Sequence, residues 1–575
     1  MELAGVGAAP GIAVGPVWRY ASSAAGRGRP SLDIRVAAEL AAAELMALAG
    51  RVRASGRADD AAILEAQSLM ALDPLLLDAI EARAKSIPSP GGRPMATGDR
   101  ADALASIVEA VAGSTADTLA ALPDETLAAR AADVRDVGAR IARIVTGRVV
   151  ALPDQPAIAV ADDLPPSVAA EIPDGQLLGV ALERGSATSH AAILARGLGI
   201  PAVVGVRGLL AASASNIEAT TVALDGDAGR VIFAPSSDEL AALESERRDR
   251  EAAGAKARSL RGQPGRTADG HAIELLANIG RVEDADRALE AGAEGVGLFR
   301  TEFLFVGRSG APTEDEQATA YRKVFAAFGE RPVVVRLLDV GGDKPLPYLR
   351  LAAESNPFLG IRGVRLAGEH RPILLTQLRA IARAGAGLAS VPRVMAPMVA
   401  TLEDVDRFRS MVDEAFADLD RSGIERAAHF ELGIMIEVPS AAMMAAELAR
   451  RVDFFSIGSN DLTQYVLAMD RTHPELAAAA DALHPAVLRA IRMTIDGARA
   501  GGIEVAVCGE LAGDRIGSLV LAGLGIAELS MDAGRLDAVR FELQQRSFAE
   551  LEQLAAAALA AGSAQEVRAL VRPAR

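Results

Sequence analysis

Seven short segments set the fold class: IELLANI (273–279), GVGLF (295–299), VVVRLLDV (333–340), RVMAPM (393–398), LGIMIEV (432–438), FFSIG (454–458) and IEVAVCGE (503–510). Each segment is mainly apolar, and each is followed by a stretch with helical character. Near-continuous apolar strands are typical of parallel sheets that are buried on both faces. About 310 residues of such repeated units favour a closed (β/α)8 barrel over an open sheet. We therefore predict a TIM barrel over residues 266–575.

Polar residues stand at the carboxyl ends of these predicted strands, where barrels place their chemistry. They are Arg300, Arg336, Glu437, Asn460, Asp461 and Cys508. A guanidinium is costly to bury without an anionic partner, so Arg300 and Arg336 on successive strands indicate a doubly anionic ligand. The alternative is two structural ion pairs with the nearby Glu302 and Asp339.

Two of these residues, Glu437 and Asp461, offer hard oxygen ligands from adjacent predicted strands. Mg²⁺ is usually held by one or two carboxylates together with waters and phosphate oxygens. The pair therefore predicts a Mg²⁺ site, to which Asn460 and Arg471 add hydrogen-bond donors. Cys508 is either a small buried hydrophobic residue or, beside these positive charges, a reactive thiolate.

Composition excludes several classes of protein. The 60 Lys and Arg residues stand against 76 Asp and Glu residues, and the formal charge of −16 is the wrong sign for a protein that coats nucleic-acid phosphates. The single cysteine excludes an intramolecular disulfide and a cysteine-based zinc site. The sequence contains no apolar run of about 18 residues without a charge, so we expect no membrane span and a cytoplasmic location.

The first half of the chain divides by pattern into an α/β domain with a helical insertion. Residues 1–20 read as an edge strand, and residues 148–234 contain six short strand patterns, beginning with VVAL (149–152), and the hairpin LDGDAGRVIF. Between them, apolar residues repeat at helical spacing, and we expect helices near 33–55, 58–85, 99–121 and 124–146. The predicted domains are 1–32 with 148–234, the insert 33–147, a charged linker helix at 235–265, and the barrel.

His190 opens a predicted helix (189–197) within the segment GSATSHAAILARGLGIPAVVG (185–205). A phosphate on its imidazole would face the positive end of the helix and free backbone amides. Thr188 adds a hydroxyl that can bond the ring or the phosphate. His190 is therefore a candidate phosphoryl acceptor, and the alternative is a helix residue without a chemical role.

Several long motifs resemble those of phosphoenolpyruvate-protein phosphotransferases, the enzymes I of the bacterial sugar phosphotransferase system. They are GSATSHAAILAR, GVGLFRTEFL, VRLLDVGGDKPLPY, NPFLGIRGVR, DFFSIGSNDLTQY and CGELAGD, and the N-terminal GAAPGIAVGPVW and the helical RAADVRDVGARI look similar too. The resemblance covers essentially the whole chain. It implies transfer of the phosphoryl group of phosphoenolpyruvate to a histidine of the enzyme and then to the histidine-containing phosphocarrier protein HPr, with release of pyruvate.

The resemblance also implies roles for individual residues. His190 would be the phosphohistidine; Arg300, Arg336, Arg362, Asn460 and Arg471 would bind phosphoenolpyruvate; Glu437 and Asp461 would bind Mg²⁺; and Cys508 would donate the proton that completes pyruvate. It further implies a homodimer formed through the barrel and a mobile linker.

The sequence departs from the family pattern at three positions. Ser186 and Ala187 stand where Gly and a basic residue are usual, and Gln67 stands where His is common, in the part of the chain that would face the partner.

Two other functions are compatible with parts of this pattern. Pyruvate phosphate dikinases and phosphoenolpyruvate synthases share similar histidine and barrel domains, but they need a nucleotide-binding domain before the histidine. Only 189 residues precede His190 here, and they contain no Walker-type glycine loop. A non-catalytic phosphoenolpyruvate-binding regulator would not need the intact set of chemical residues.

Overall fold

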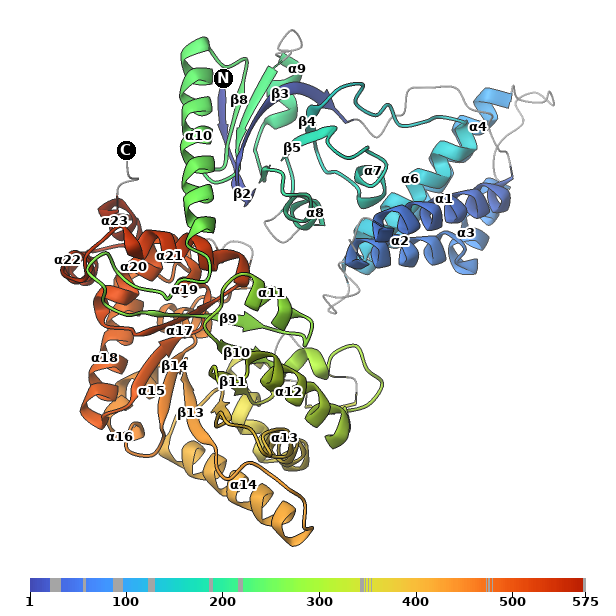
Figure 1. The fold of residues 1–575 in the computed structure, drawn as a ribbon. Coiled ribbons are helices and arrows are strands. Elements are labelled where there is room, and N and C mark those ends of the chain that lie inside the picture. Colours follow the sequence, from blue (N-terminus) through green and yellow to red (C-terminus); the bar gives the residue numbers. More distant parts are fainter. Residues whose placement is uncertain are drawn as a thin grey trace. The chain divides into compact units, whose positions relative to one another are not determined.

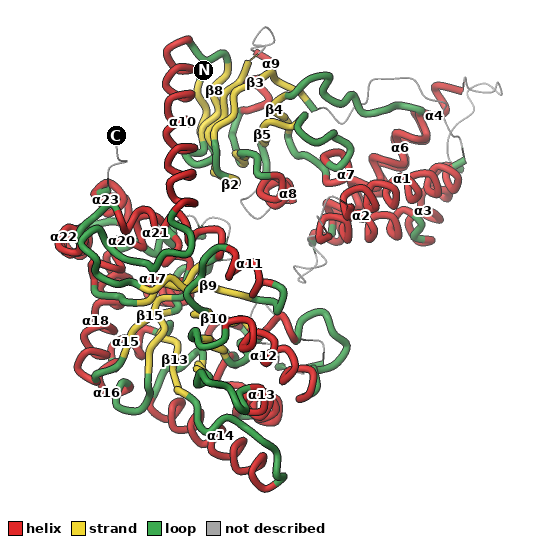
Figure 2. The backbone as a smooth tube through the Cα atoms, in the orientation of Figure 1, coloured by secondary structure: helices red, strands yellow, loops and turns green. Residues whose placement is uncertain are grey.

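The computed structural model describes residues 1–20, 33–54, 58–85, 97–121, 130–185, 190–215, 221–341, 346, 348–349, 351–352, 354–471, 473, 476–477 and 479–571, apart from the side chains of 58–60, 97 and 190. The chain forms two compact units, Met1–Arg250 and Glu251–Arg575. Figure 1 labels most of their helices and many of their strands, and Figure 2 separates helix, strand and loop.

The second unit is a closed barrel of eight parallel strands, which confirms the predicted fold class. In barrel order the strands are β9 (Glu274–Ile279), β10 (Val296–Arg300), β11 (Val333–Arg336), β12 (Arg393–Ala396), β13 (Glu431–Ile436), β14 (Phe454–Ile457), β15 (Glu504–Val507) and β16 (Glu528–Met531). Seven of them correspond to the seven segments identified in the sequence. The eighth, β16, pairs with β9 and closes the barrel. Its residues, ELSM, mix polar and apolar side chains and do not stand out as a strand pattern.

Helices cover the outside of the barrel. The main ones are α11 (Asp284–Glu290), α12 (Glu314–Phe328), α13 (Arg371–Ala384), α14 (Leu402–Arg421), α17 (Ser459–Leu467), α18 (Pro485–Gly501), α20 (Arg515–Leu524), α21 (Leu536–Gln544), α22 (Phe548–Ala560) and α23 (Ala564–Leu570). Short helical turns at the strand ends are η2 (Thr301–Leu304), η3 (Pro357–Leu359), η4 (Gly363–Ala367), α15 (Pro439–Met443), α16 (Ala445–Leu448), α19 (Glu510–Gly513) and η5 (Ala533–Arg535). Capping boxes at Thr313 and Thr401 fix where α12 and α14 begin.

The first unit contains an eight-stranded sheet in the order β1-β8-β7-β3-β4-β5-β6-β2. The strands are β1 (Glu2–Ala4), β2 (Val6–Ala9), β3 (Ile12–Arg19), β4 (Ala157–Ala161), β5 (Leu177–Leu182), β6 (Ala202–Val204), β7 (Thr221–Asp225) and β8 (Arg230–Phe233). The predicted single edge strand at 1–20 is wrong, because this segment supplies both edges and the central strand β3. Only Gly5 separates the two edge strands in the chain, so the sheet curls until its edges meet there. A Cβ at Gly5 would lie 2.6 Å from Val206 Cγ2.

Helices pack on both faces of this sheet. Alternate residues of each strand point to opposite faces, and α7 (Pro166–Ala169) and α8 (His190–Leu198) cover one face, while α9 (Leu209–Ser215) covers the other. The predicted strand VVAL (149–152) is wrong. This segment packs Val150 and Leu152 on the first face, and its Ala151 carbonyl accepts a hydrogen bond from Trp18 Nε1.

The inserted helices are α1 (Ile34–Ala54), α2 (Ala58–Ala71), α3 (Pro74–Ala84), α4 (Thr97–Ala120) and α6 (Ala131–Thr146). The single helix predicted over 58–85 is wrong. Pro74 begins a new helix there, and the Asp73 side chain caps it by accepting from Leu75 N. The turn-forming segment 86–94 and Pro123 lie outside the described residues.

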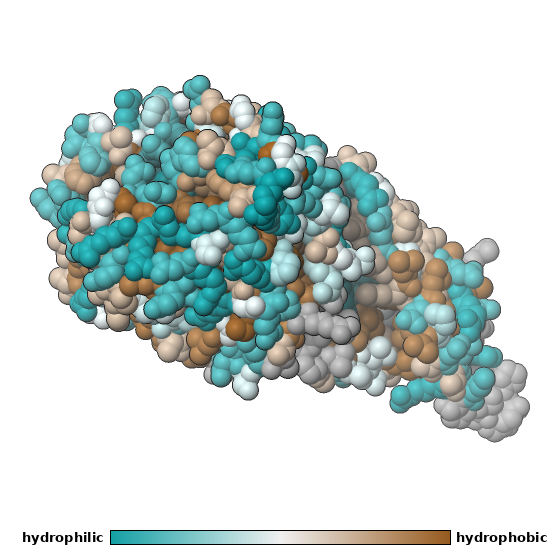
Figure 3. All heavy atoms as spheres, turned by 90° about the horizontal axis from the view of Figure 1, so that it is seen from below, coloured by the Kyte–Doolittle hydropathy of each residue, from teal (hydrophilic) through white to brown (hydrophobic). Residues whose placement is uncertain are grey.

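The charged helix expected after the sheet is α10 (Ser237–Ser259), which begins in the first unit and ends in the second. The four-domain division with its boundaries stays a prediction. Within the described parts of the chain, no helix is both long enough and apolar enough to cross a membrane. The face drawn in Figure 3 carries hydrophilic side chains with hydrophobic side chains between them.

Candidate active site

A cavity of about 280 Å³ lies at the carboxyl end of the barrel strands. Eight of the nine residues predicted for the site line it: Arg300, Arg336, Arg362, Glu437, Asn460, Asp461, Arg471 and Cys508. Their segments are up to about 200 residues apart in the chain, and the parallel strands bring their ends together. The ninth, His190, is the first residue of α8 in the other unit. Its side chain, and all of Ser186, Ala187 and Thr188, lie outside the described part of the chain.

The two arginines that end successive strands have different surroundings. Arg336 is buried, and its Nη2 donates to Glu302 Oε1 at 2.8 Å, while its Nη1 lies 3.7 Å from Asp339 Oδ2. The alternative of a structural ion pair therefore describes a real contact of Arg336. Arg300 forms no ion pair with the residues that the structure describes, and its guanidinium is available to an anion.

Arg362 joins two carboxylates in the wall of the cavity. Its Nε and Nη2 donate to the two oxygens of Asp339 at 3.1 and 2.7 Å, and its Nη1 donates to Asp461 Oδ1 at 3.1 Å. Arg471 Nη1 lies 3.3 Å from the other oxygen, Asp461 Oδ2. Carboxylates and guanidinium groups therefore alternate from Glu302 to Arg471 around the cavity.

Glu437 is buried, and only one of its oxygens has a protein partner among the described residues. Oε1 accepts from the backbone N–H of Met398 at 2.6 Å, while Oε2 has no hydrogen-bond partner. Gly458 leaves room for the carboxylate, because a Cβ there would lie 2.9 Å from Oε2. Burial raises the pKa of Glu437, the Asp461 and Asp339 carboxylates raise it further, and Arg336 and Arg362 act against them.

These oxygens fit a hard divalent cation that keeps other ligands. Glu437 Oε2 is a buried oxygen without a hydrogen-bond donor, and Asp461 is the other carboxylate predicted to bind the ion. Over the described residues there is no group of three or more His, Cys, Asp or Glu side chains able to hold a metal. A two-carboxylate site is the kind that Mg²⁺ occupies with waters and substrate oxygens rather than in a full protein cage.

Cys508 lies in the barrel interior beside Leu298, Met435 and Phe454. Burial raises the pKa of its thiol to about 11; Arg336 and Arg300 lower it and Glu437 raises it. The two guanidinium groups favour the thiolate, but loss of hydration outweighs them, so the reactive-thiolate alternative is wrong. The thiol keeps its proton near neutral pH.

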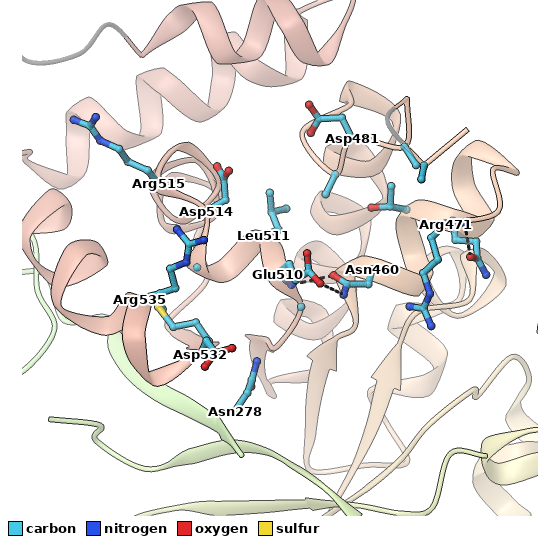
Figure 4. A pocket seen from close by; sticks show the side chains of 18 of the residues that line it. Asn278, Asn460, Arg471, Asp481, Glu510, Leu511, Asp514, Arg515, Asp532 and Arg535 are labelled. Atoms are coloured by element: carbon cyan, nitrogen blue, oxygen red, sulfur yellow. Dashed lines mark hydrogen bonds between the residues drawn. The ribbon is translucent and has the colours of Figure 1, made fainter. Parts of the chain in front are cut away.

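A larger cavity of about 890 Å³ adjoins the first and shares Arg300, Asn460 and Arg471 with it. Figure 4 shows Asn460 and Glu510 turned toward each other. Asn460 Nδ2 donates to Glu510 Oε1 at 3.2 Å, and the Glu510 N–H donates to Asn460 Oδ1 at 3.0 Å. These two hydrogen bonds fix the orientation of the Asn460 amide, which is predicted to bind the ligand.

Sequence reasoning missed several residues that hold this site in place. Asn278 Nδ2 donates to the carbonyl of Cys508 at 2.9 Å, and the fully buried Gln377 links Thr301 to the backbone N–H of Leu338. Gln67, which the sequence places in the helical insert, is buried there and donates to Asp133 and Asp136. A lone Asn or Gln in a sequence gives no signal of such contacts, because each contact is made to residues distant in the chain.

The fold and this site define the class of phosphoenolpyruvate-utilising enzymes. Residues 254–548 match the family model of the phosphoenolpyruvate-binding domain of these enzymes, residues 153–229 match their mobile domain, and residues 4–87 match their N-terminal region.

Full-length relatives then identify the family. The chain is 42% identical over 584 residues to a phosphoenolpyruvate-protein phosphotransferase of Streptomyces coelicolor, covering 98% of both chains, and 39% identical over 579 residues to one of Bacillus sp. (strain S), covering 99% of this chain and 97% of that protein. It is also 42% identical to a multiphosphoryl transfer protein of Rhodobacter capsulatus, of which it spans 67%. The chain belongs to the phosphoenolpyruvate-protein phosphotransferase family. The predicted family, its function and its enzyme class are thereby confirmed.

Proposed function

We propose that His190 accepts the phosphoryl group of phosphoenolpyruvate at the mouth of the barrel and passes it to a histidine of HPr. In the first step a P–N bond forms to the imidazole, the P–O bond to the enol oxygen breaks, and the enolate that leaves takes up a proton to become pyruvate. In the second step the P–N bond of His190 is exchanged for one to the carrier. One observation carries the proposal: four guanidinium groups and two candidate metal-binding carboxylates meet at a single cavity.

The arginines supply what phosphoryl transfer requires. This reaction needs the donor held in line and the charge on the phosphoryl oxygens neutralised. Arg300, Arg336, Arg362 and Arg471 line the cavity and would bind the carboxylate and phosphate of the substrate. The amide of Asn460, fixed by Glu510, would add a neutral donor.

Glu437 and Asp461 would hold Mg²⁺. The support is the free oxygen of Glu437 and the position of Asp461 beside two substrate arginines. When bound, the ion neutralises charge on the phosphoryl oxygens. The residues around it fix the carboxylates: the Met398 N–H orients Glu437, and Arg362 and Arg471 orient Asp461.

Cys508 would donate the proton to the enolate carbon. Its thiol lines the cavity and stays protonated near neutral pH because burial raises its pKa to about 11. A protonated thiol is the form that a general acid needs. Asn278, which holds the Cys508 carbonyl, would keep the thiol at the floor of the cavity.

The remaining features of the proposal rest on family membership. They are docking of HPr on the helical insert 33–147, a mobile linker at 235–265, a homodimer through the barrel, and a cytoplasmic location. Light scattering at micromolar concentration with substrate and Mg²⁺ tests the dimer. A monomeric mass under those conditions contradicts it.

The decisive experiment is intact mass measurement after incubation with phosphoenolpyruvate and Mg²⁺. We expect one added phosphate that is lost in acid, as phosphohistidine is, and its transfer to added HPr. A parallel incubation with ATP in place of phosphoenolpyruvate should add none. An unchanged mass with phosphoenolpyruvate would refute the proposed function.

A further inference from the structure

Asp339 lies between two of the arginines that line the cavity. It follows β11 in the chain, its side chain is buried, and it lines the cavity beside Arg336 and Arg362. Among the described residues it is the one carboxylate that contacts both of these arginines, at 3.7 Å from Arg336 and at 2.7 Å from Arg362.

The contact with Arg362 determines how that guanidinium is turned. Asp339 takes Nε and Nη2 in a bidentate pair, at 3.1 and 2.7 Å. Such a pair fixes the plane of the guanidinium as well as its position. Nη1 then remains for Asp461, so the Asp339 contact leaves this edge of Arg362 turned toward the metal-binding residues.

Asp339 is itself fixed by a neighbouring strand end. Its backbone N–H donates to Glu302 Oε1 at 3.1 Å, and the same oxygen accepts from Arg336 Nη2 at 2.8 Å. Glu302 follows β10, Asp339 follows β11 and Arg362 precedes η4. Three separate segments are therefore joined through two buried carboxylates: Glu302 holds the Asp339 N–H, and Asp339 holds Arg362.

We propose that Asp339 is a positioning residue that preorganises Arg336 and Arg362 for phosphoenolpyruvate. This inference rests on the proposed function, because it assigns the two arginines to that substrate. A free arginine side chain loses considerable rotamer freedom when a ligand immobilises it, and this loss weakens binding. By holding both guanidinium groups before substrate arrives, Asp339 removes much of that loss.

A second role for the same carboxylate gives the opposite expectation. If Asp339 only balanced the charge of the empty cavity, its negative charge would repel the substrate. Asp339→Asn would then leave the cavity more positive, and phosphoenolpyruvate would bind more tightly. The positioning role requires weaker binding, because the Asn amide has lost the second oxygen of the bidentate pair.

Calorimetry separates the two roles. Phosphoenolpyruvate would be titrated, at fixed Mg²⁺, into the full chain carrying His190→Ala, which blocks turnover, with and without Asp339→Asn. We expect Asp339→Asn to raise the dissociation constant at least tenfold. Asp404→Asn is the matched control. Asp404 is the buried third residue of α14, and as part of the capping box its side chain accepts from the N–H groups of Ala400 and Thr401. Loss of its charge should leave the constant within twofold.

Equal or tighter binding in Asp339→Asn overturns the inference while leaving the proposed function intact. If the parent chain itself does not bind phosphoenolpyruvate, both are wrong. Should Asp339→Asn fail to fold, Glu302→Gln takes its place, because Glu302 holds Arg336 and the Asp339 N–H, and the same weakening is required. In the chain with His190 intact, phosphoryl exchange with HPr should be unchanged in every variant that folds.

Discussion

The strongest test of the proposed metal site uses the contact between Arg471 and Asp461. Asp461 is predicted to bind Mg²⁺, yet in the structure its Oδ2 lies 3.3 Å from Arg471 Nη1 and its Oδ1 accepts from Arg362 Nη1 at 3.1 Å. The cation must therefore compete with guanidinium groups for the same carboxylate. Arg471→Gln removes one competitor and should tighten the binding of Mg²⁺, or of Mn²⁺ as its paramagnetic substitute, when substrate is absent.

The distance and the exposure set the size of the effect. At 3.3 Å and an effective dielectric constant of about 20, two unit charges interact with roughly 5 kcal/mol. The Arg471 side chain is 31% exposed, so screening and side-chain entropy reduce the net value to roughly 1–1.5 kcal/mol. Since about 1.4 kcal/mol is a factor of ten, we expect the dissociation constant for the cation to fall about five- to tenfold.

Arg300→Gln is the matched control for this measurement. Arg300 lines the same cavity but forms no ion pair with the described residues, so its removal changes the local charge without releasing Asp461. Mn²⁺ binding is measured by electron paramagnetic resonance or calorimetry without phosphoenolpyruvate. If Arg471→Gln binds the ion no more tightly than Arg300→Gln does, the competition at Asp461 is refuted.

Four further predictions concern other parts of the chain. His190→Ala should abolish all phosphorylation, as measured by intact mass, while calorimetry still detects phosphoenolpyruvate binding; any phosphate on this variant would contradict the assignment of His190 as the acceptor. Cys508→Ala should slow pyruvate formation by about 10²–10⁴-fold, the usual contribution of a general acid, and leave phosphoryl exchange with HPr unchanged; equal loss in both assays would indicate a folding role. A fragment of residues 1–260 should exchange phosphate with phosphorylated HPr but fail to use phosphoenolpyruvate, and failure of the exchange would show that the predicted boundaries are wrong. Burial raises the pKa of Glu528 from 4.5 to about 7, so the folded state binds this proton more tightly than the unfolded state, and the stability that the proton contributes is present below pH 4.5 and lost as pH rises to 7. The free energies of unfolding of wild type and Glu528→Gln, measured with denaturant, should therefore change relative to each other by roughly 1–3 kcal/mol across this window, and a difference that stays constant with pH would refute the shift.

Short-range patterns in the sequence determine much of the fold. Apolar segments alternating with helical stretches predict a barrel because a parallel strand is buried on both faces and needs a helical crossover. The eighth strand, β16, escaped detection because its pairing with β9, and not its composition, makes it a strand. The role of residues 1–20 was missed for the same reason, since a strand pattern does not reveal whether its partners lie on one side or on both.

In the candidate site, too, the sequence predicts the residue types but not their contacts. The residue types at the strand ends, Arg300 and Arg336 with Glu437 and Asp461, predict an anion and a cation site because the barrel topology gathers strand ends at one mouth. The sequence also names Glu302 and Asp339 as nearby partners of the arginines. It does not show that Asp339 holds Arg362 from a different loop, because that contact depends on where two loops meet in space.

The sequence alone determined the residue types and their order, and hence the barrel, the candidate anion-binding arginines and the candidate acceptor His190. Tertiary structure alone decided which charges touch, whether Cys508 keeps its proton, and where Gln67 lies. The physical reason is that periodicity and strand ends are local properties of the chain. Ion pairs, burial and pKa shifts instead depend on distances between segments that only the packed molecule brings together.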